Sequence, residues 1–346
     1  MRNVDLRLGD CRDILTELED NSVDSIVTDP PYELGFMGKK WDGSGIAFDV
    51  EMWEQCLRVL KPGGHMLAFG GSRTWHRLTV AIEDAGFEIR DSIAWLYGSG
   101  FPKSLDVSKA IDKAAGAERE VRQWQGWSTA LKPSFEPIVV ARKPLVGTVA
   151  ANVLEHGTGA LNIDACRIGD GSESQGPRDS SEPSATRRYT SSGAVNIAAT
   201  PGPRGGSPSG RWPTNVVLDD TQAAELDKQS GNLPGGVTVR RNMHGQEQNA
   251  NGIYGSRKRY ASEDFTYGDS GGASRFFPVF KYQAKAPTKE RPKVDGVAHP
   301  TVKPLELMRW LVKLVTPPGG CSAGPLRGQR NHGGGVPRRG FRLHRH

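Results

Sequence analysis

Ser25-Ile26-Val27-Thr28-Asp29-Pro30-Pro31-Tyr32 is the stretch of this 346-residue chain that decides its fold. Its first four residues are a short run rich in β-branched side chains, which predicts the end of a buried strand. The two prolines cannot continue a strand ladder, so the chain must leave the sheet at Asp29. A residue before proline is held in extended geometry, so neither Asp29 nor Pro30 begins a helix. We therefore predict a stiff loop at the carboxyl end of a strand, where open α/β sheets bind their ligands.

This loop brings together one carboxylate (Asp29), carbonyls without matching N–H groups, and one aromatic ring (Tyr32). An exocyclic amine of adenine or cytosine is a poor nucleophile because its lone pair is delocalised into the ring. Asp29 and the Pro30 carbonyl could both accept hydrogen bonds from such an amine and direct its lone pair at a methyl donor. Tyr32 could stack on a base taken out of a duplex. The same residues also suit a strand-ending Pro-Pro turn capped by its aspartate, so the rest of the chain must decide.

Asp29-Pro30-Pro31-Tyr32 resembles motif IV of the DNA amino-methyltransferases, which methylate adenine N6 or cytosine N4. Motif IV comes early here and a His-Pro-Thr-x-Lys-Pro motif comes late, an order similar to that of the circularly permuted β group of this family. The resemblance covers roughly residues 1–150 and 275–320. The other segments that carry it are Leu8-Gly9-Asp10-Cys11, Asp24, Leu60-Lys61-Pro62-Gly63-Gly64 and His299-Pro300-Thr301-Val302-Lys303-Pro304.

The resemblance implies a site-specific DNA methyltransferase that uses S-adenosylmethionine and flips its target base out of duplex DNA. It implies that Asp29 and Pro30 hold the amine, that Pro31 stiffens the loop and that Tyr32 stacks on the base. An aspartate at the first motif position favours adenine N6 over cytosine N4. Duplex DNA is the implied partner, and a restriction endonuclease partner is left open.

The resemblance also implies a cofactor side, made of Asp10, His299, Thr301, Lys303 and Pro304. Asp10 opens a predicted amphipathic helix over residues 11–18, so an N-cap role explains it equally well. Residues 305–315 predict a strongly apolar helix, and the free N–H groups at its start suit the cofactor carboxylate. A capped core helix without a ligand explains the same pattern.

Strands alternating with helices predict a doubly wound, Rossmann-like α/β sheet with a large irregular insertion. The glycine-rich residues 33–49, with Trp41, either close over a flipped base or form a surface loop. Strands are expected at 4–8, 25–28, 65–69, 92–97, 137–141, 214–218 and 276–282, and helices at 11–18, 50–60, 75–85, 104–115, 146–161 and 305–315.

Four parts follow from this pattern: a catalytic half (1–142), an inserted target-recognition region (143–275), a returning methyltransferase segment (276–320) and a basic tail (321–346). Gly, Pro and Ser fill 22 of the 42 positions in 169–210, which predicts disorder there. Candidate phosphate contacts in the inserted region are Arg240, Arg241, Arg257, Lys258 and Arg259, although a solvated loop explains them as well.

The net charge of +6 does not indicate nucleic-acid binding by the folded body. The last 26 residues hold six arginines and no acid, and the remaining chain carries 39 basic and 39 acidic residues. Four widely spaced cysteines without metal-ligand spacing predict a reduced, cytoplasmic protein with no disulfide or metal site. No apolar run approaches the length of a membrane span, and the first residues show no signal-peptide pattern.

The segment after Pro317-Pro318-Gly319-Gly320 departs from the family that the chain resembles. There a strand leads into a loop of the form Asp-Pro-Phe-x-Gly-Ser-Gly-Thr-Thr, which holds the methionine end of the cofactor. The residues here, Cys321 to His332, show neither a strand pattern nor an acid. We therefore expect a fold that is incomplete at its C-terminus, without the central strand, the next strand and the acid that would hold the cofactor ribose.

The genetic code offers an explanation for this departure. Codons allowed for Gly324 to His332, read one base later, permit Asp-Pro-Phe-Ala-Gly-Ser-Gly-Thr-Thr in register, and Val336 to Phe341 permit Cys-Arg-Ala-Glu-Gly-Phe. We hypothesise a frameshift within residues 320–323, which predicts weak or absent methyl transfer and poor stability. The competing interpretation is an inactive truncated remnant that at most binds DNA. Methylation of RNA or protein is less favoured, because the large insertion suits duplex recognition.

Overall fold

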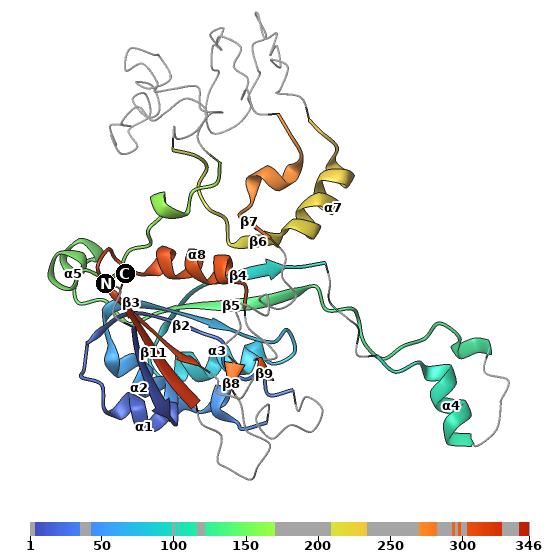
Figure 1. Cartoon of the computed structure of the whole chain (residues 1–346), viewed down its shortest axis with the longest axis horizontal. Helices are drawn as coiled ribbons and strands as arrows, with labels where there is room; N and C mark the ends of the chain where they lie inside the picture. The colour runs from blue at the N-terminus through green and yellow to red at the C-terminus, as the bar shows by residue number, and fades with distance from the viewer. Residues whose placement is uncertain are drawn as a thin grey trace, which may run out of the picture. The chain divides into compact units, whose positions relative to one another are not determined.

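A computed structural model describes residues 4–34, 43–98, 100, 102, 104–115, 122–169, 209–233, 270–281, 293–294, 297–298, 303–326 and 339–345. Its centre is a nine-stranded mixed sheet with the order β1-β11-β10-β2-β3-β5-β4-β6-β7 (Figure 1). The strands are β1 Val4–Gly9, β2 Val23–Thr28, β3 Leu60–Phe69, β4 Glu88–Leu96, β5 Phe135–Arg142, β6 Val216–Asp219, β7 Val279–Phe280, β10 Cys321–Leu326 and β11 Arg339–Arg345, with β8 Lys293–Val294 and β9 Val297–Ala298 as a separate antiparallel pair.

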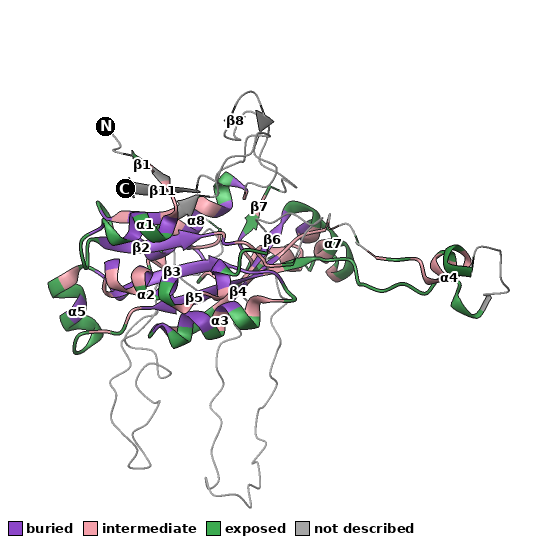
Figure 2. Ribbon diagram, turned by 90° about the horizontal axis from the view of Figure 1, so that it is seen from below, coloured by how far each residue is buried: buried purple, intermediate pink, exposed green. Residues whose placement is uncertain are grey.

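Helices cover the two faces of this sheet with different sets of side chains. On one face, α1 Cys11–Thr16, α2 Val50–Val59 and α3 Trp75–Asp84 pack on Ile26, Met66 and Val139. On the other, α8 Leu305–Val315 packs on the neighbours of those residues, Val27, Leu67 and Ile138. Alternate residues of one strand point to opposite faces, and Figure 2 shows β2, β3 and β5 buried throughout much of their length. The prediction of a doubly wound α/β sheet is confirmed.

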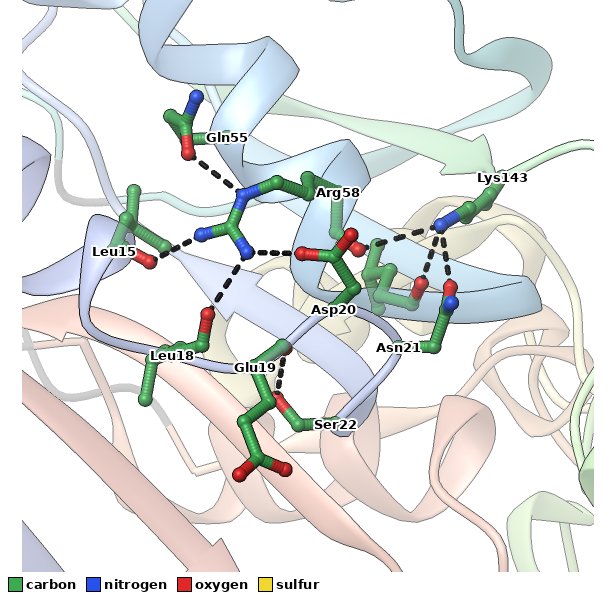
Figure 3. A network of polar contacts seen from close by, with 10 residues as sticks. Leu15, Leu18, Glu19, Asp20, Asn21, Ser22, Gln55, Arg58 and Lys143 are labelled. Atoms are coloured by element: carbon green, nitrogen blue, oxygen red, sulfur yellow. Dashed lines mark hydrogen bonds and ion pairs between the residues drawn. The ribbon is translucent and has the colours of Figure 1, made fainter.

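The turn that leads into β2 is held by two basic side chains (Figure 3). The Arg58 guanidinium, from the last turn of α2, donates to the carbonyls of Leu15 (2.6 Å) and Leu18 (2.8 Å) at and beyond the end of α1. Lys143 Nζ donates to Asn21 Oδ1 (2.8 Å), and Asn21 has a φ of 55°, in the left-handed region that asparagine tolerates. These contacts fix where β2 begins and so where Asp29 emerges.

The described residues also form the helices α4 Val107–Ala115, α5 Val149–His156 and α7 Asp220–Ser230. The sequence did not predict α7. Its signal is Asp219, which ends β6 and whose Oδ1 accepts hydrogen bonds from Gln222 N (2.6 Å) and Thr221 Oγ1 (2.7 Å). An aspartate that caps the first turn after an apolar strand is the usual start of a helix.

The expectation that no strand follows Gly320 was wrong. β10 runs parallel to β2, with Ser322 opposite Ser25 and Ala323 opposite Ile26, and β11 pairs antiparallel with β10 and with β1. The edge of β2 presents unpaired backbone N–H and C=O groups, which any extended backbone can satisfy whatever its side chains. Small residues fit here, since Ser322 is 3% and Ala323 2% exposed.

Element boundaries differ from the predicted ones at several elements; α5, for example, covers only Val149–His156 of the helix predicted over 146–161. β3 starts directly after α2 at Leu60, whereas a Lys-Pro-Gly-Gly turn was expected to separate the helix from a strand at 65–69. The predicted strand at 276–282 is a 3₁₀ turn over Ala273–Phe276 followed by the two-residue strand β7. Residues 170–208, within the stretch predicted to be disordered, lie outside the described residues.

The chain divides into two compact units. Unit 1 comprises Met1–Cys166, Thr214–Ala223 and Pro278–His346 and contains the sheet. Unit 2 comprises Arg167–Pro213 and Ala224–Phe277. In its described part, Asp227 accepts hydrogen bonds from Ser274 N and Ser274 Oγ, both at 2.7 Å. β6, within the region predicted as an insertion, belongs to the sheet of unit 1.

Candidate active site

The Asp-Pro-Pro-Tyr loop begins where the sequence predicted, directly after Thr28 at the carboxyl end of β2. β3 runs parallel beside β2 and ends at Phe69, one residue beyond the partner of Thr28. β5 is antiparallel to β3, so its first residues come to the same edge, and Glu136 is the second of them. Asp29, Phe69 and Glu136 thus arise from three neighbouring strands at one edge of the sheet.

Tyr32 is fixed by the loop that follows β3. Thr74 Oγ1 donates to the carbonyl of Tyr32 (2.7 Å). A Cβ on Gly71 would lie 3.1 Å from Tyr32 Cδ2, so glycine permits the close approach of the two loops. Glu33 then turns the chain with a φ of 54°, a strained conformation for a residue that is not glycine. Tyr32 is therefore held by the loop after β3 and by the turn at Glu33.

Lys303, from the His-Pro-Thr-Val-Lys-Pro motif, reaches this corner. Its Nζ lies 3.2 Å from Asp29 Oδ1, 2.8 Å from Glu136 Oε2 and 2.7 Å from the Tyr32 hydroxyl. The Tyr32 hydroxyl in turn donates to Glu136 Oε2 (2.8 Å). The ammonium group also lies 5.0 Å from the ring centroid of Tyr32 and 4.8 Å from that of Phe69, within cation–π range. Residues more than 270 positions apart in the chain therefore form one polar cluster.

Burial and charge act against each other in this cluster. Burial raises the pKa of Asp29, and the Lys303 ammonium lowers it. Burial would lower the pKa of Lys303, but the charges of Asp29 and Glu136 outweigh it and raise that pKa. Burial and the same two carboxylates raise the pKa of Tyr32 well above its ordinary value. Lys303 is therefore the cation and Tyr32 a neutral hydrogen-bond donor at neutral pH.

The remaining predicted site residues fall into two groups. Asp10 is the N-cap of α1, where Arg12 N donates to Asp10 Oδ1 (3.0 Å), so its capping role is confirmed, while a cofactor contact stays a prediction. Pro304 directly precedes α8, with Lys303 before it. The others lie outside the described residues: His299, Thr301, Arg240, Arg241, Arg257, Lys258 and Arg259. So does Trp41 of the loop expected to close over a base.

Sequence reasoning missed two members of the cluster. Glu136 directly precedes the strand expected at 137–141, and Phe69 is the last residue of the strand expected at 65–69; neither is among the predicted site residues. Their signal is positional: both lie at strand ends on the edge where the Asp-Pro-Pro-Tyr loop leaves the sheet. A single charged residue inside an apolar strand start, as in Phe135-Glu136-Pro137-Ile138, requires a partner when it becomes buried.

The C-terminal segment does not fit the cofactor that the motifs imply. From Cys321 onward the chain has no acidic residue, so nothing there can bind the ribose hydroxyls of S-adenosylmethionine through a carboxylate. β10 ends at Leu326, and the sequence after it lacks the Asp-Pro-Phe-x-Gly-Ser-Gly-Thr-Thr pattern, whose glycines let a backbone approach the methionine end. The described cluster at the edge of the sheet is therefore not matched by the cofactor motif in the sequence that follows Gly320.

The part of the chain that the structure describes shows neither a metal-binding cluster nor a membrane-spanning helix. No cluster of three or more His, Cys, Asp or Glu side chains there could hold a metal ion. None of the described helices is long and apolar enough to cross a membrane.

Residues 23–323 match the family model of the DNA methylases, N6_N4_Mtase. The chain belongs to the DNA methylase family. The match includes the Asp-Pro-Pro-Tyr loop, Glu136 and Lys303, and it ends at the point where the C-terminal segment departs from the expected motif.

Curated relatives of this DNA methylase are the Type II methyltransferases M.HindIII of Haemophilus influenzae and M.HpaI of Haemophilus parainfluenzae. M.HindIII is 34% identical over 117 residues, which cover 33% of this chain and 38% of M.HindIII. M.HpaI is 36% identical over 104 residues, which cover 28% of this chain and 33% of M.HpaI. The chain thus spans little more than a third of the length of the curated relatives that it matches.

Two solved structures are similar over less than half of this chain. The cytosine-N4-specific PvuII DNA methyltransferase matches with a TM-score of 0.27 and 16% identity, over 44% of this chain and 62% of that chain. The complex of M1.HpyAVI with SAM matches with a TM-score of 0.24 and 19% identity, over 39% and 53%. The family assignment rests on the sequence match.

Proposed function

We propose that this DNA methylase descends from, and is built as, a site-specific DNA methyltransferase that transfers a methyl group from S-adenosylmethionine to the exocyclic amine of a base flipped out of duplex DNA. The observation that carries the proposal is the cluster of Asp29, Tyr32 and Lys303 at the carboxyl edge of the sheet. Two motifs at opposite ends of the family match supply these residues.

The loop at residues 29–32 supplies the groups that accept hydrogen bonds from the base amine. Lys303 Nζ lies 3.2 Å from Asp29 Oδ1, and the Asp29 side chain is 31% exposed, so this carboxylate is open to a hydrogen bond from a base amine. The Pro30 carbonyl provides a second acceptor two peptide planes away. Two acceptors on one NH2 group withdraw its protons from the plane of the base and direct the nitrogen lone pair outward. The rigid Pro30-Pro31 backbone keeps this geometry without cost at the moment of reaction.

Adenine N6 is the proposed acceptor rather than cytosine N4, because the first residue of the motif is an aspartate. An ionised carboxylate is a stronger acceptor than a hydroxyl and suits the less basic amine of adenine. Tyr32, with its hydroxyl held by Glu136, presents a ring fixed in place for stacking on the extruded base.

Unit 2 is the proposed target-recognition part. Its described residues include Arg211 and Arg275, whose guanidinium groups lie 5.2 and 4.2 Å from the centroid of the Phe276 ring. Arginines stacked on aromatic rings are common where proteins contact nucleic acid. Arg240, Arg241, Arg257, Lys258 and Arg259 remain proposed phosphate contacts.

A second candidate function is that of an inactive remnant which at most binds DNA. The absence of any acid after Gly320 favours it, because the donor side has lost the residues that would bind the cofactor. In this case the chain retains a surface for DNA and an acceptor corner without a methyl donor.

Isothermal calorimetry with S-adenosylmethionine and the purified 346-residue chain separates the two candidates. An active enzyme requires saturable binding and methyl incorporation into DNA from a radiolabelled donor. We expect weak or no binding for this chain, and saturable binding after the displaced reading frame is restored. Failure of the restored chain to bind the cofactor would contradict the proposed function.

A further inference from the structure

We infer that Lys303 and Glu136 are positioning residues for the methyl-acceptor base: Lys303 holds the Asp29 carboxylate and the Tyr32 hydroxyl in place, and Glu136 anchors Lys303. The inference rests on the proposed function, since the group they serve is the base amine that Asp29 accepts. It moves Lys303 from the cofactor side, where the sequence motif suggested it, to the acceptor side of the site.

The hydrogen-bond inventory of Lys303 supports this assignment. A lysine ammonium has three N–H donors. Its three oxygen partners here are Asp29 Oδ1 at 3.2 Å, Glu136 Oε2 at 2.8 Å and the Tyr32 hydroxyl at 2.7 Å. Every N–H donor of the Lys303 ammonium therefore has a partner among Asp29, Glu136 and Tyr32.

Burial makes these contacts strong. The Lys303 side chain is 15% exposed and that of Glu136 19%, while Asp29 is 31% exposed and remains open on one side. An ion pair that is largely removed from water is held more firmly than a surface pair, and removing one partner leaves an uncompensated charge. The partly open Asp29 is thus the member of the cluster that can receive a ligand.

Glu136 is needed because Lys303 contacts both the Asp29 carboxylate and the Tyr32 hydroxyl. Without Glu136, one donor of the Lys303 ammonium would lose its carboxylate partner, and the Tyr32 hydroxyl would lose its acceptor at 2.8 Å. Glu136 Oε2 accepts from both groups. The phenol and the ammonium group therefore share one acceptor, which fixes both beside Asp29.

The charged and titratable groups around Asp29 come from each element at this edge. They are Lys303 ahead of α8, Glu136 on β5, and Tyr32 on the same loop, and Tyr97 after β4 adds to the surroundings of Tyr32. Lys303 favours the ionised form of Asp29, whereas Glu136 favours the protonated form. Replacing each of the two must therefore move the protonation of Asp29 in opposite directions.

The test is a pH titration of the full chain labelled with ¹³Cγ-aspartate and followed by NMR, with Asp29→Asn to identify the Asp29 signal. Lys303→Met raises the titration midpoint of Asp29 by about one pH unit, Glu136→Gln lowers it, and Lys303→Arg leaves it near the parent value. Lys313→Met, which removes an exposed lysine on α8, is the matched control and leaves the midpoint unchanged. Midpoints that do not move, or that move in one direction for both variants, would overturn the inference.

A binding experiment links the cluster to the base amine. The probes are DNA duplexes with one unpaired adenine or one unpaired purine that lacks the amine. Discrimination by a hydrogen bond to a carboxylate predicts about tenfold tighter binding of the adenine probe by the parent chain. Lys303→Met and Glu136→Gln reduce this preference, and Lys313→Met retains it.

The two experiments distinguish failure of the inference from failure of the proposed function. If the parent chain shows no adenine preference while the Asp29 midpoint responds as expected, the positioning cluster stands and the proposed function fails. If the preference exists and survives both Lys303→Met and Glu136→Gln, the positioning role is refuted and the proposed function stands.

Discussion

At the scale of single residues, the net charge of the cluster determines which ligand groups it can bind. Two carboxylates, Asp29 and Glu136, share one ammonium group, so the cluster carries one net negative charge when all three are ionised. That excess charge suits a base amine, whose nitrogen becomes positive as it gains a methyl group. Under the proposed function, the cluster would stabilise charge where it develops, which is the most effective place for an electrostatic contribution.

The buried His65 on β3 predicts a loss of stability in acid. Burial, followed by the nearby charges of Arg142 and Arg90, lowers the pKa of His65 to about 4. The unfolded chain takes up the proton near pH 6.5, so stability is complete above that pH and is lost as the pH falls toward 4. Between pH 7 and pH 5, this one group lowers the free energy of unfolding by about 2 kcal/mol.

Denaturant unfolding at the two pH values measures this effect. His65→Gln should reduce the pH dependence by about that amount. His76→Gln, on the exposed face of α3, is the control and should retain the parental dependence. Equal pH dependence in His65→Gln and the parent would contradict the prediction.

The acceptor loop could be predicted from the sequence because its information is local. Two prolines after a β-branched run fix both the end of the strand and the shape of the corner at Asp29. Glu136 could not be predicted, because its partners come from positions 32 and 303 and depend on which strands become neighbours. Lys303 was singled out by its motif, but only the fold shows which side of the site it faces.

At the scale of elements, the buried Asp24 carboxylate holds the start of β10 on the sheet. Asp24 Oδ1 pairs with Lys61 Nζ (2.6 Å), and Asp24 Oδ2 accepts a hydrogen bond from Cys321 N (2.6 Å). Asp24 is 5% exposed, and its neighbour Ser25 contacts Thr316 Oγ1 (2.7 Å). These contacts hold the start of β10 against β2 without depending on the side chains of β10.

Asp24→Ala should therefore lower the free energy of unfolding by about 2–3 kcal/mol, because it removes the carboxylate that accepts from Cys321 N and pairs with the half-buried Lys61 ammonium. The measurement is urea unfolding followed by tryptophan fluorescence. Asp20→Ala removes a carboxylate of the same type that is 67% exposed and pairs with Arg58, and should cost less than about 1 kcal/mol. Equal losses in the two variants would show that the tie to β10 is unimportant.

Helices and strands with strong periodicity were predictable, and α8 matches its predicted range of 305–315. The apolar spacing of Leu307, Leu311 and Leu314 determines it locally. The prediction failed at β10, where the side chains give no strand pattern. There the open edge of β2 and the contact from Asp24 determine the backbone conformation, and both are properties of the assembled sheet.

At the scale of the whole molecule, the frameshift hypothesis gives the C-terminal segment an origin different from that of the body that matches the family. The family match ends at residue 323. Read one base later, the codons of Cys321, Ser322 and Ala323 permit Val-Val-Leu directly ahead of the displaced Asp-Pro-Phe motif. Larger apolar residues would thus occupy the centre of the sheet, where Ser322 and Ala323 now lie buried.

Sequencing of the gene tests this origin. We expect a single-base change within the codons of residues 320–323, followed by a displaced frame that encodes the glycine loop and the two strands around it. The restored chain should unfold at a higher denaturant concentration, because the larger side chains add buried apolar area in the centre of the sheet. A displaced frame with an early stop codon, or without the motif, would refute the frameshift.

The central claim is that the acceptor corner at Asp29 holds a base amine for methylation. Its most direct test maps modified bases in host DNA that carries the restored gene, the restored gene with Asp29→Ala, or the gene for the 346-residue chain. The account predicts N6-methyladenine at one recurring sequence with the restored gene and none with Asp29→Ala or the present chain. Equal methylation with and without the Asp29 carboxylate would contradict it.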